Sequence, residues 1–215
     1  MIISHGRRYI FVHIPKTGGT SMALALEGRA MKDDIMLGDT PKARKRRRRL
    51  KNAQSSGRLW KHSTLADIDG LIDTSDIASL FTFTLVRNPW DRLVSYYHWL
   101  RKQSFDHVSV HLARHLDFPR FVSDERTQAS LRAHPARSYM TCADGVERCT
   151  SYIRIEAFEE DAENLNAHLG FALSLTHVNR SERTTHYQSY YSVETAEIVG
   201  ECCAEDIARF GYRFE

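Results

Sequence analysis

The 215-residue chain lacks any long apolar segment and contains only four cysteines. No apolar run approaches the roughly 20 residues that a membrane-spanning helix requires, and the N-terminus lacks the charged and apolar regions of a secretory signal peptide. The cysteines form neither a C-x-x-C pair nor a Cys/His spacing typical of zinc sites. These absences predict a cytoplasmic protein with no transmembrane segment and no metal site. Cys142 and Cys149 flank the turn-like Asp144-Gly145, so the sequence leaves undecided whether these two cysteines form a disulfide.

A strong excess of one charge is also absent, since 30 Lys and Arg against 27 Asp and Glu give a net charge of +3. Eight of the basic residues, however, lie within Lys42–Lys51, which leaves 22 basic against 27 acidic residues elsewhere. The segment around them, residues 38–57, is polar and of low complexity, which predicts an exposed loop or a partly disordered insert. Such an insert could be a solvated loop, a guide for anionic ligands, or a patch for nucleic acid or a membrane surface.

A buried strand that leads into a helix is predicted twice. Arg8–Ile14 is short, aromatic and β-branched, and Thr20–Met31 then places apolar residues at the spacing of one helical face. Phe81–Val86 is a second such strand, after which Asn88 suits the N-cap of a helix and Pro89 its first position. Two strands that each lead into a helix indicate an α/β fold around a mainly parallel sheet.

The remaining elements are less regular. The pattern predicts a short strand at 58–62, a short helix at 64–72, helical structure over 105–134, a hairpin or two strands at 138–142 and 149–155, and helices at 157–169 and 193–210. No internal repeat and no linker is visible, so we expect a single domain over residues 1–215.

The segment between the first strand and its helix has the composition of an anion-binding loop. Where a strand gives way to a helix, backbone N–H groups converge on one point and bind phosphate or sulfate. Gly18 and Gly19 would let an anion approach closely, and Lys16 would supply a mobile charge. Hydroxyl donors follow at Thr17, Thr20 and Ser21. The lysine precedes the glycines, so this is not a Walker A loop. A glycine-rich turn with a solvated lysine is the alternative.

The second strand–helix junction offers another anion site. Arg87 follows the strand directly, at the edge where open α/β sheets bind ligands. Ser95 lies eight residues later, two turns into the helix and off its apolar stripe. A guanidinium and a hydroxyl in these positions could hold a second phosphate.

These residues resemble the sulfotransferase family, and more closely its carbohydrate-type branch. Phe11–Ser21 is similar to the 5′-phosphosulfate loop of that family, and Phe83–Tyr97 is similar to its 3′-phosphate motif. Weaker similarity extends to residues 152–170 and 177–181. The resemblance implies a P-loop-like central parallel β-sheet flanked by helices. It also implies transfer of a sulfuryl group from 3′-phosphoadenosine-5′-phosphosulfate (PAPS) to a hydroxyl or amine of an acceptor, with a carbohydrate favoured. The product would be adenosine 3′,5′-bisphosphate (PAP), and no metal is implied.

The resemblance also assigns binding residues. The 5′ side of the nucleotide would be held by Lys16, Thr17, Gly18, Gly19, Thr20 and Ser21, and the 3′-phosphate by Arg87 and Ser95. Arg180, in the weaker similarity, could line the adenine or 3′-phosphate side, or it could belong to a capped turn.

Sulfuryl transfer needs a cation for the departing oxygen and a base for the acceptor hydroxyl. Lys16 is the candidate cation. Of the 11 histidines, His62 is the first choice of base, because it lies between the two anion motifs and resembles the family histidine upstream of the 3′-phosphate motif. His13, inside a strand, is interpreted as structural, and His98 is held in reserve.

Two other functions stay open on the sequence alone. One is a P-loop-type kinase or NTPase with a degenerate phosphate loop, which the position of Lys16 disfavours. The other is a non-catalytic polyanion-binding module that depends on the basic segment Lys42–Lys51. For a sulfotransferase, the same segment could steer an anionic acceptor, whereas nucleic acid is disfavoured and a peripheral membrane contact stays open.

Overall fold

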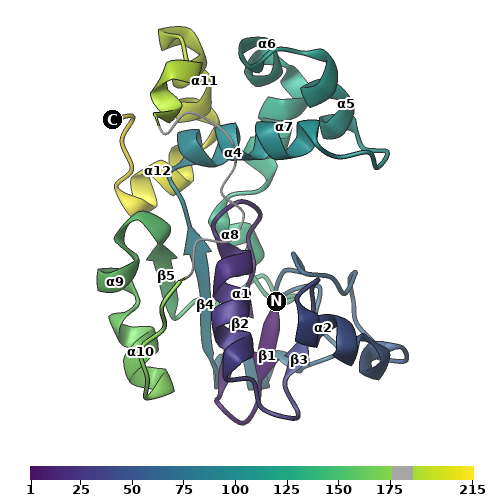
Figure 1. The fold of residues 1–215 in the computed structure, drawn as a ribbon. Coiled ribbons are helices and arrows are strands. Elements are labelled where there is room, and N and C mark those ends of the chain that lie inside the picture. Colours follow the sequence, from purple (N-terminus) through teal and green to yellow (C-terminus); the bar gives the residue numbers. More distant parts are fainter. Residues whose placement is uncertain (176–185) are drawn as a thin grey trace. The chain divides into compact units, whose positions relative to one another are not determined.

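The computed structural model of the protein describes residues 1–175 and 186–215 (Figure 1). The chain divides into two compact units. The first contains Met1–Val86 and the segment that starts at Ala136, and the second contains Arg87–Pro135 and the C-terminal segment. Within the described ranges, no helix combines the length and apolar character that crossing a bilayer requires.

The first unit is built on a mixed five-stranded sheet with the order β3-β1-β2-β4-β5. The strands are β1 (Ile2–Ser4), β2 (Tyr9–Val12), β3 (Ile35–Met36), β4 (Phe81–Val86) and β5 (Ser151–Arg154). Strands β2, β4 and β5 run parallel, which confirms the predicted α/β class. The expectation did not include β1, which pairs antiparallel with β2 and β3. Only four residues separate β1 from β2, too few for the crossover that parallel pairing needs.

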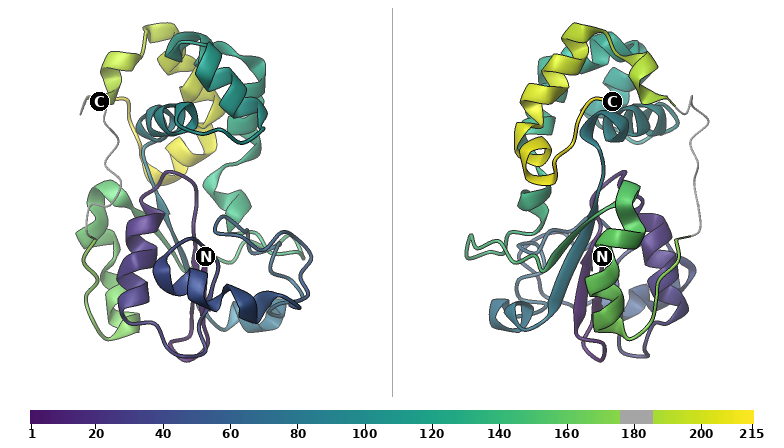
Figure 2. Two further views of the ribbon diagram at one scale, coloured as in Figure 1. Left: turned by 45° about the vertical axis from the view of Figure 1, so that its right-hand side comes forward. Right: turned by 90° about the vertical axis from the view of Figure 1, so that its left-hand side faces the viewer.

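The parallel strands are covered by helices whose apolar side chains enter the same core. Phe11 of β2 pairs with Phe83 of β4, with ring centroids 5.3 Å apart. Met22 of α1 (Gly19–Gly28) and Leu165 of α10 (Glu163–Leu169) pack in the same buried cluster. Figure 2 shows α1 and α10 on the same side of the sheet. The sheet and these helices hold the loop between β2 and α1 in place.

The other helices of the first unit are short. They are α2 (Pro41–Arg46), η1 (Arg47–Leu50), α3 (Thr74–Ala78), α8 (Ala136–Tyr139), η2 (Ile155–Ala157) and α9 (Phe158–Asp161). The range 157–169, predicted as one helix, is covered by three short elements: the end of η2, α9 and α10.

The basic segment is helical over residues 41–50, so the prediction of a loop or a partly disordered insert is wrong there. Most of its side chains are exposed, as expected. Proline suits the first helical position of α2, and Ala43 is buried. The backbone N–H of Lys42 donates to Oε1 of Glu27 at 3.0 Å, and Arg46 donates to the carbonyl of Asp34 at 3.1 Å. These partners come from earlier segments of the chain, so local composition could not indicate them.

Three smaller predictions in the first unit also differ from the structure. Residues 58–62 form a bend and turn instead of a strand, and residues 64–72 form successive turns instead of a helix. The region 138–149 holds α8 and one isolated bridge, Thr141↔Glu147. Hydrogen bonds of Ser63 and Asp67 stabilise the turns between residues 58 and 72 locally, which explains why an extended strand does not form at 58–62.

No disulfide joins the four cysteines, all of which lie in the described ranges.

The second unit is helical. It contains α4 (Pro89–Arg101), α5 (Val108–His115), α6 (Phe118–Ser123), α7 (Glu125–Ala133), η3 (Tyr187–Tyr190), α11 (Val193–Cys202) and α12 (Ala204–Phe210). The apolar stripe expected on α4 is buried in its core, at Trp90, Leu93, Val94, Tyr97 and Leu100. Asn88 caps α4 as predicted, because its side-chain oxygen accepts from the N–H groups of Trp90 and Asp91.

Asn88 therefore offers a test of how α4 is anchored. Replacing it with alanine removes the cap and the donation from its Nδ2 to the carbonyl of Arg213 at 2.9 Å. Asn88→Ala should lower the free energy of unfolding by about 1–2 kcal/mol in urea titration. Asn88→Ser keeps a capping oxygen and should lose clearly less. Equal losses in the two variants would show that the cap contributes nothing.

Candidate functional site

The loop between β2 and α1 has a strained backbone. Lys16 has φ 68° and Gly18 has φ 86°, both in the left-handed region. The hydroxyl of Thr17, between them, donates to the carbonyl of Ile14 at 2.9 Å. A lysine rarely adopts this conformation, and such strain persists only where the surrounding structure imposes it, often at ligand-binding sites. The backbone of this loop is therefore typical of a ligand-binding loop and not of an ordinary turn.

The N-terminus of α1 supplies hydrogen-bond donors at the end of this loop. The first backbone N–H groups of any helix have no acceptor within the helix, and they carry a partial positive charge. The N-cap residue of α1 is Gly18, which has no side chain to accept from them, and the first turn contains no acidic residue. Thr20 is half-buried, and Thr17 and Ser21 are buried beside it. The arrangement suits an anion.

The glycine pair is also required by packing within the protein. A Cβ atom on Gly18 would lie 2.2 Å from Cδ1 of Ile155. A Cβ atom on Gly19 would lie 2.0 Å from Cδ2 of His13. The sequence interpretation credited both glycines to close approach of a ligand. The structure adds a second reason, which is that Gly19 leaves room for the His13 ring.

His62 lies against the end of β2. Its Nδ1 is 2.7 Å from the carbonyl oxygen of His13. A carbonyl oxygen only accepts, so Nδ1 carries the proton and, in the neutral ring, Nε2 is left as the proton acceptor. The His62 ring packs edge-on against His13, at a centroid distance of 4.5 Å, and against Trp60, at 5.0 Å. Both the orientation and the tautomer of this histidine are therefore set by its neighbours.

The turn that carries His62 is held from several directions. The hydroxyl of Ser63 donates to the carbonyl of Arg58 at 2.8 Å and accepts from the N–H of Trp60 at 2.9 Å. The amino group of Met1 donates to the carbonyl of Lys61 at 2.8 Å, and burial lowers its pKa to about 4. The ammonium of Lys61 is 3.1 Å from Oδ2 of Asp39. His62 thus extends from a fixed backbone.

His13 is the residue whose importance the sequence interpretation missed. Only 6% of its surface is exposed. Burial lowers its pKa well below the ordinary value, and the nearby His62, Met1 amino group, Lys61 and Lys16 lower the pKa further. His13 is structural as expected, yet its carbonyl orients His62 and its ring packs against Gly19. β2 ends at Val12, so His13 lies directly after the strand and not inside it as predicted.

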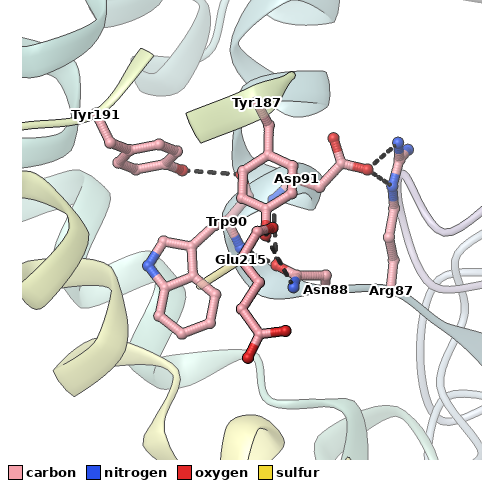
Figure 3. Close-up of polar contacts among 7 residues, drawn as sticks. All are labelled: Arg87, Asn88, Trp90, Asp91, Tyr187, Tyr191 and Glu215. Carbon is pink, nitrogen blue, oxygen red and sulfur yellow. Dashed lines mark hydrogen bonds and ion pairs between the residues drawn. The ribbon is translucent and has the colours of Figure 1, made fainter. Parts of the chain in front are cut away.

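The second anion motif lies in the other unit, where α4 begins (Figure 3). Oδ2 of Asp91 accepts from Nε of Arg87 at 2.8 Å and also from its Nη2. This ion pair is partly buried and joins residues four positions apart in the sequence. Ser95 follows one turn later on the same helix and is only 4% exposed. The Asp91 carboxylate holds the Arg87 guanidinium in a defined orientation.

Tyrosines and the C-terminal tail support the start of α4 (Figure 3). The hydroxyl of Tyr191 donates to the carbonyl of Trp90 at 2.8 Å, and that of Tyr187 donates to the carbonyl of Glu215 at 2.7 Å. Nδ2 of Asn88 lies 3.3 Å from the Tyr187 hydroxyl. These partners are about 100 residues away in sequence, so the local motif did not reveal them.

The predicted site residues are distributed over both units. Lys16–Ser21 and His62 lie in the first unit, whereas Arg87, Ser95 and the reserve candidate His98 lie in the second. Arg180 lies outside the described residues. In the part of the chain that is described, no group of three or more His, Cys, Asp or Glu side chains could hold a metal ion.

Gly19 can be tested against Gly28, at the other end of the same helix. In Gly19→Ala the methyl group must displace the His13 ring, so we expect the free energy of unfolding to fall by about 2 kcal/mol or more. A Cβ atom on Gly28 meets nothing within 4 Å, so Gly28→Ala should be neutral or up to about 1 kcal/mol stabilising. Urea denaturation measures both. A Gly19→Ala protein as stable as Gly28→Ala would contradict the packing described here.

The buried His13 should also make folding sensitive to acid. Its folded-state pKa lies well below its ordinary 6.5, so below pH 6.5 the unfolded chain binds a proton that the folded protein excludes. Stability is therefore lost as the pH falls below 6.5, by at most about 1.4 kcal/mol per pH unit. In His13→Phe, the free energy of unfolding measured in urea titrations should change less steeply between pH 6.5 and 5. The difference should approach the contribution of one bound proton, about 1.4 kcal/mol per pH unit. The Met1 amino group, whose pKa is also lowered, acts equally in both proteins. Identical slopes would disprove the assignment.

Comparison with known proteins identifies the family. The sequence model of the sulfotransferase family matches residues 1–212. Among solved structures, mouse sulfotransferase SULT7A1 complexed with PAP is similar at 14% identity and a TM-score of 0.49, over 96% of this chain and 86% of that chain. No curated protein sequence matches. Because the family match covers almost the whole chain, the protein belongs to the sulfotransferase family, and the family and enzyme class that the two motifs predicted are confirmed.

Proposed function

We propose that the protein transfers the sulfuryl group of PAPS to a hydroxyl of a carbohydrate acceptor, with Lys16 and His62 as its catalytic residues. Membership of the sulfotransferase family supports sulfuryl transfer as the reaction. The single observation that carries the residue assignment is the 2.7 Å contact of His62 Nδ1 with the His13 carbonyl, beside the strained Lys16 loop. The family match spans both units, which supports one functional domain over residues 1–215.

The β2–α1 loop would hold the 5′ side of the donor. The N–H groups at the start of α1 and the hydroxyls of Thr17, Thr20 and Ser21 are suited to the oxygens of a phosphosulfate. Gly18 and Gly19 keep side chains out of the loop at these positions. In-line transfer forms a bond from the acceptor oxygen to sulfur and breaks the bond from sulfur to the bridging oxygen of PAPS. Negative charge builds on that bridging oxygen, where the Lys16 ammonium would stabilise it.

Arg87 and Ser95 would hold the 3′-phosphate. Asp91 accepts from Nε and Nη2 of Arg87 through one oxygen. This ion pair fixes the plane of the guanidinium, and a planar guanidinium suits a charge-assisted contact with phosphate. Arg180 stays a proposed contact on the same side of the nucleotide. The reaction releases PAP and needs no metal in this scheme.

His62 would act as the base. With the Nδ1 proton donated to the His13 carbonyl, Nε2 can accept the proton of the acceptor hydroxyl as the new O–S bond forms. The same carbonyl continues to accept from Nδ1 once the ring is protonated, so the ring does not need to turn during the reaction. General-base catalysis of this kind contributes about 10²–10⁴-fold to a rate.

Calorimetry with PAP and radiolabelled sulfate transfer test these roles. A panel of dextran, chondroitin and heparin serves as the acceptor probe. Lys16→Ala should reduce the transfer rate by about 100-fold or more, while Lys32→Ala, at an exposed lysine, should not. His62→Ala should reduce kcat by about 100-fold and change the Kd of PAP less than twofold, with exposed His5→Ala as its control.

Two outcomes would contradict the proposal. Absence of PAP binding to the intact protein would exclude the donor assignment. Equal losses of rate and PAP affinity in His62→Ala would make His62 a binding residue instead of a base.

A further inference from the structure

We propose that the exposed basic residues of α2 and η1 bind the acceptor as a polyanionic chain and lead it to His62. This basic face consists of Arg44 and Lys45 of α2, Arg47 and Arg48 of η1, and Lys51 directly after η1, all of which are exposed. The inference rests on the proposed function, because it names the acceptor class for that site.

Charge is concentrated around this face to an unusual degree. Residues 38–61 contain ten Lys and Arg and a single acidic residue, Asp39, for a net charge of +9. The chain as a whole carries +3, so all other residues together carry −6. A local field of one sign raises the concentration of oppositely charged ligands near it and speeds their association.

The segment is docked on the protein by a separate set of basic residues. Lys42 Nζ donates to the carbonyl of Glu27 at 2.7 Å, Arg46 to that of Asp34 at 3.1 Å, and Arg49 to that of Lys32 at 2.7 Å. Three cations thus anchor α2 and η1, and five others remain exposed. A docked helix presents those five in a fixed array, so binding a chain costs less conformational entropy than a flexible loop would.

The basic face is connected to the candidate base. Asp39 is 3.4 Å from Nη2 of Arg47 and 3.1 Å from Nζ of Lys61. Lys61 immediately precedes His62, and all four residues lie in the first unit. The hydrogen bond from Lys61 and the charges of Arg47 and Arg44 lower the pKa of Asp39. Within the described part of the chain, this is the one ion pair that the basic face forms with a carboxylate. It joins the face to the His62 turn.

Other partners of a basic surface fit less well. Residues 38–57 contain no aromatic side chain on which a nucleic acid base could stack, and the ring of the nearby Trp60 already packs against Arg58 and His62. Membrane-surface helices bury apolar side chains in the lipid, whereas here Ala43 is buried within the protein and Leu50 is half-buried. A polyanionic acceptor needs the exposed cations, and the Asp39 pairs with Arg47 and Lys61 connect these cations to the turn that carries His62.

The test measures binding of a fluorescent heparin oligosaccharide to the full chain. Arg44→Gln/Lys45→Gln/Arg48→Gln removes three charges from the basic face without removing an anchor or the Asp39 pair. Lys102→Gln/Arg114→Gln/Arg120→Gln removes three exposed charges from the second unit and serves as the matched control. We expect heparin affinity to fall at least tenfold in the first variant and less than twofold in the control. In the first variant, the slope of the logarithm of heparin affinity against the logarithm of salt concentration should decrease in magnitude by about two to three.

Transfer kinetics connect the face to the site. In the first variant, KM for a polyanionic acceptor should rise at least fivefold with kcat unchanged, the pattern of lost uniform binding, and the Kd of PAP should stay within twofold. Equal heparin affinity in the two variants would overturn the inference. The inference would also be overturned if a thymidine 20-mer or phosphatidylserine vesicles bound more tightly than heparin and lost this binding in the first variant. Failure of the wild-type chain to bind PAP would refute the proposed function and leave the heparin result readable on its own.

Discussion

The hydrogen bond from Nδ1 of His62 to the carbonyl of His13 is the interaction on which the candidate site depends. At 2.7 Å it joins the end of β2 to a turn 49 residues later. It selects one tautomer of His62 and leaves Nε2 as the proton acceptor. The His13 ring, buried beneath Gly19, fixes the carbonyl in turn. Strand end, glycine loop and candidate base therefore form one packed assembly.

The two anion motifs use charge in different ways. Lys16 sits on a strained loop without a helix cap, where the start of α1 adds positive potential. Arg87, just before α4, is instead held by the partly buried carboxylate of Asp91 in the first turn of that helix. An ammonium is a compact point charge that suits an oxygen whose charge changes during transfer, whereas an oriented guanidinium suits a permanent phosphate. The residue types match the roles that we propose for them.

Local patterns predicted a good part of the molecule. β4 has the predicted bounds, Asn88 and Pro89 begin α4, and the apolar stripe of α4 is buried. Such features depend on neighbours in sequence, since capping and helical periodicity act within a few residues. The fold of the basic segment was predicted wrongly because Glu27 and Asp34 stabilise its helices from distant positions. The strand predicted at 58–62 is replaced by a turn that Ser63 stabilises locally and Met1 stabilises from a distance.

By itself, the sequence determined the chemistry that is available: a lysine before a glycine pair, an arginine at a strand end, a histidine between them, and a dense run of cations. These are contiguous motifs whose composition survives any fold. Only the tertiary structure decided that His13 orients His62, that Gly19 makes room for the His13 ring, and that Asp39 joins the cations to the His62 turn. Each of these contacts is made through space by residues 6 to 49 positions apart in the chain, and no local pattern encodes such pairings.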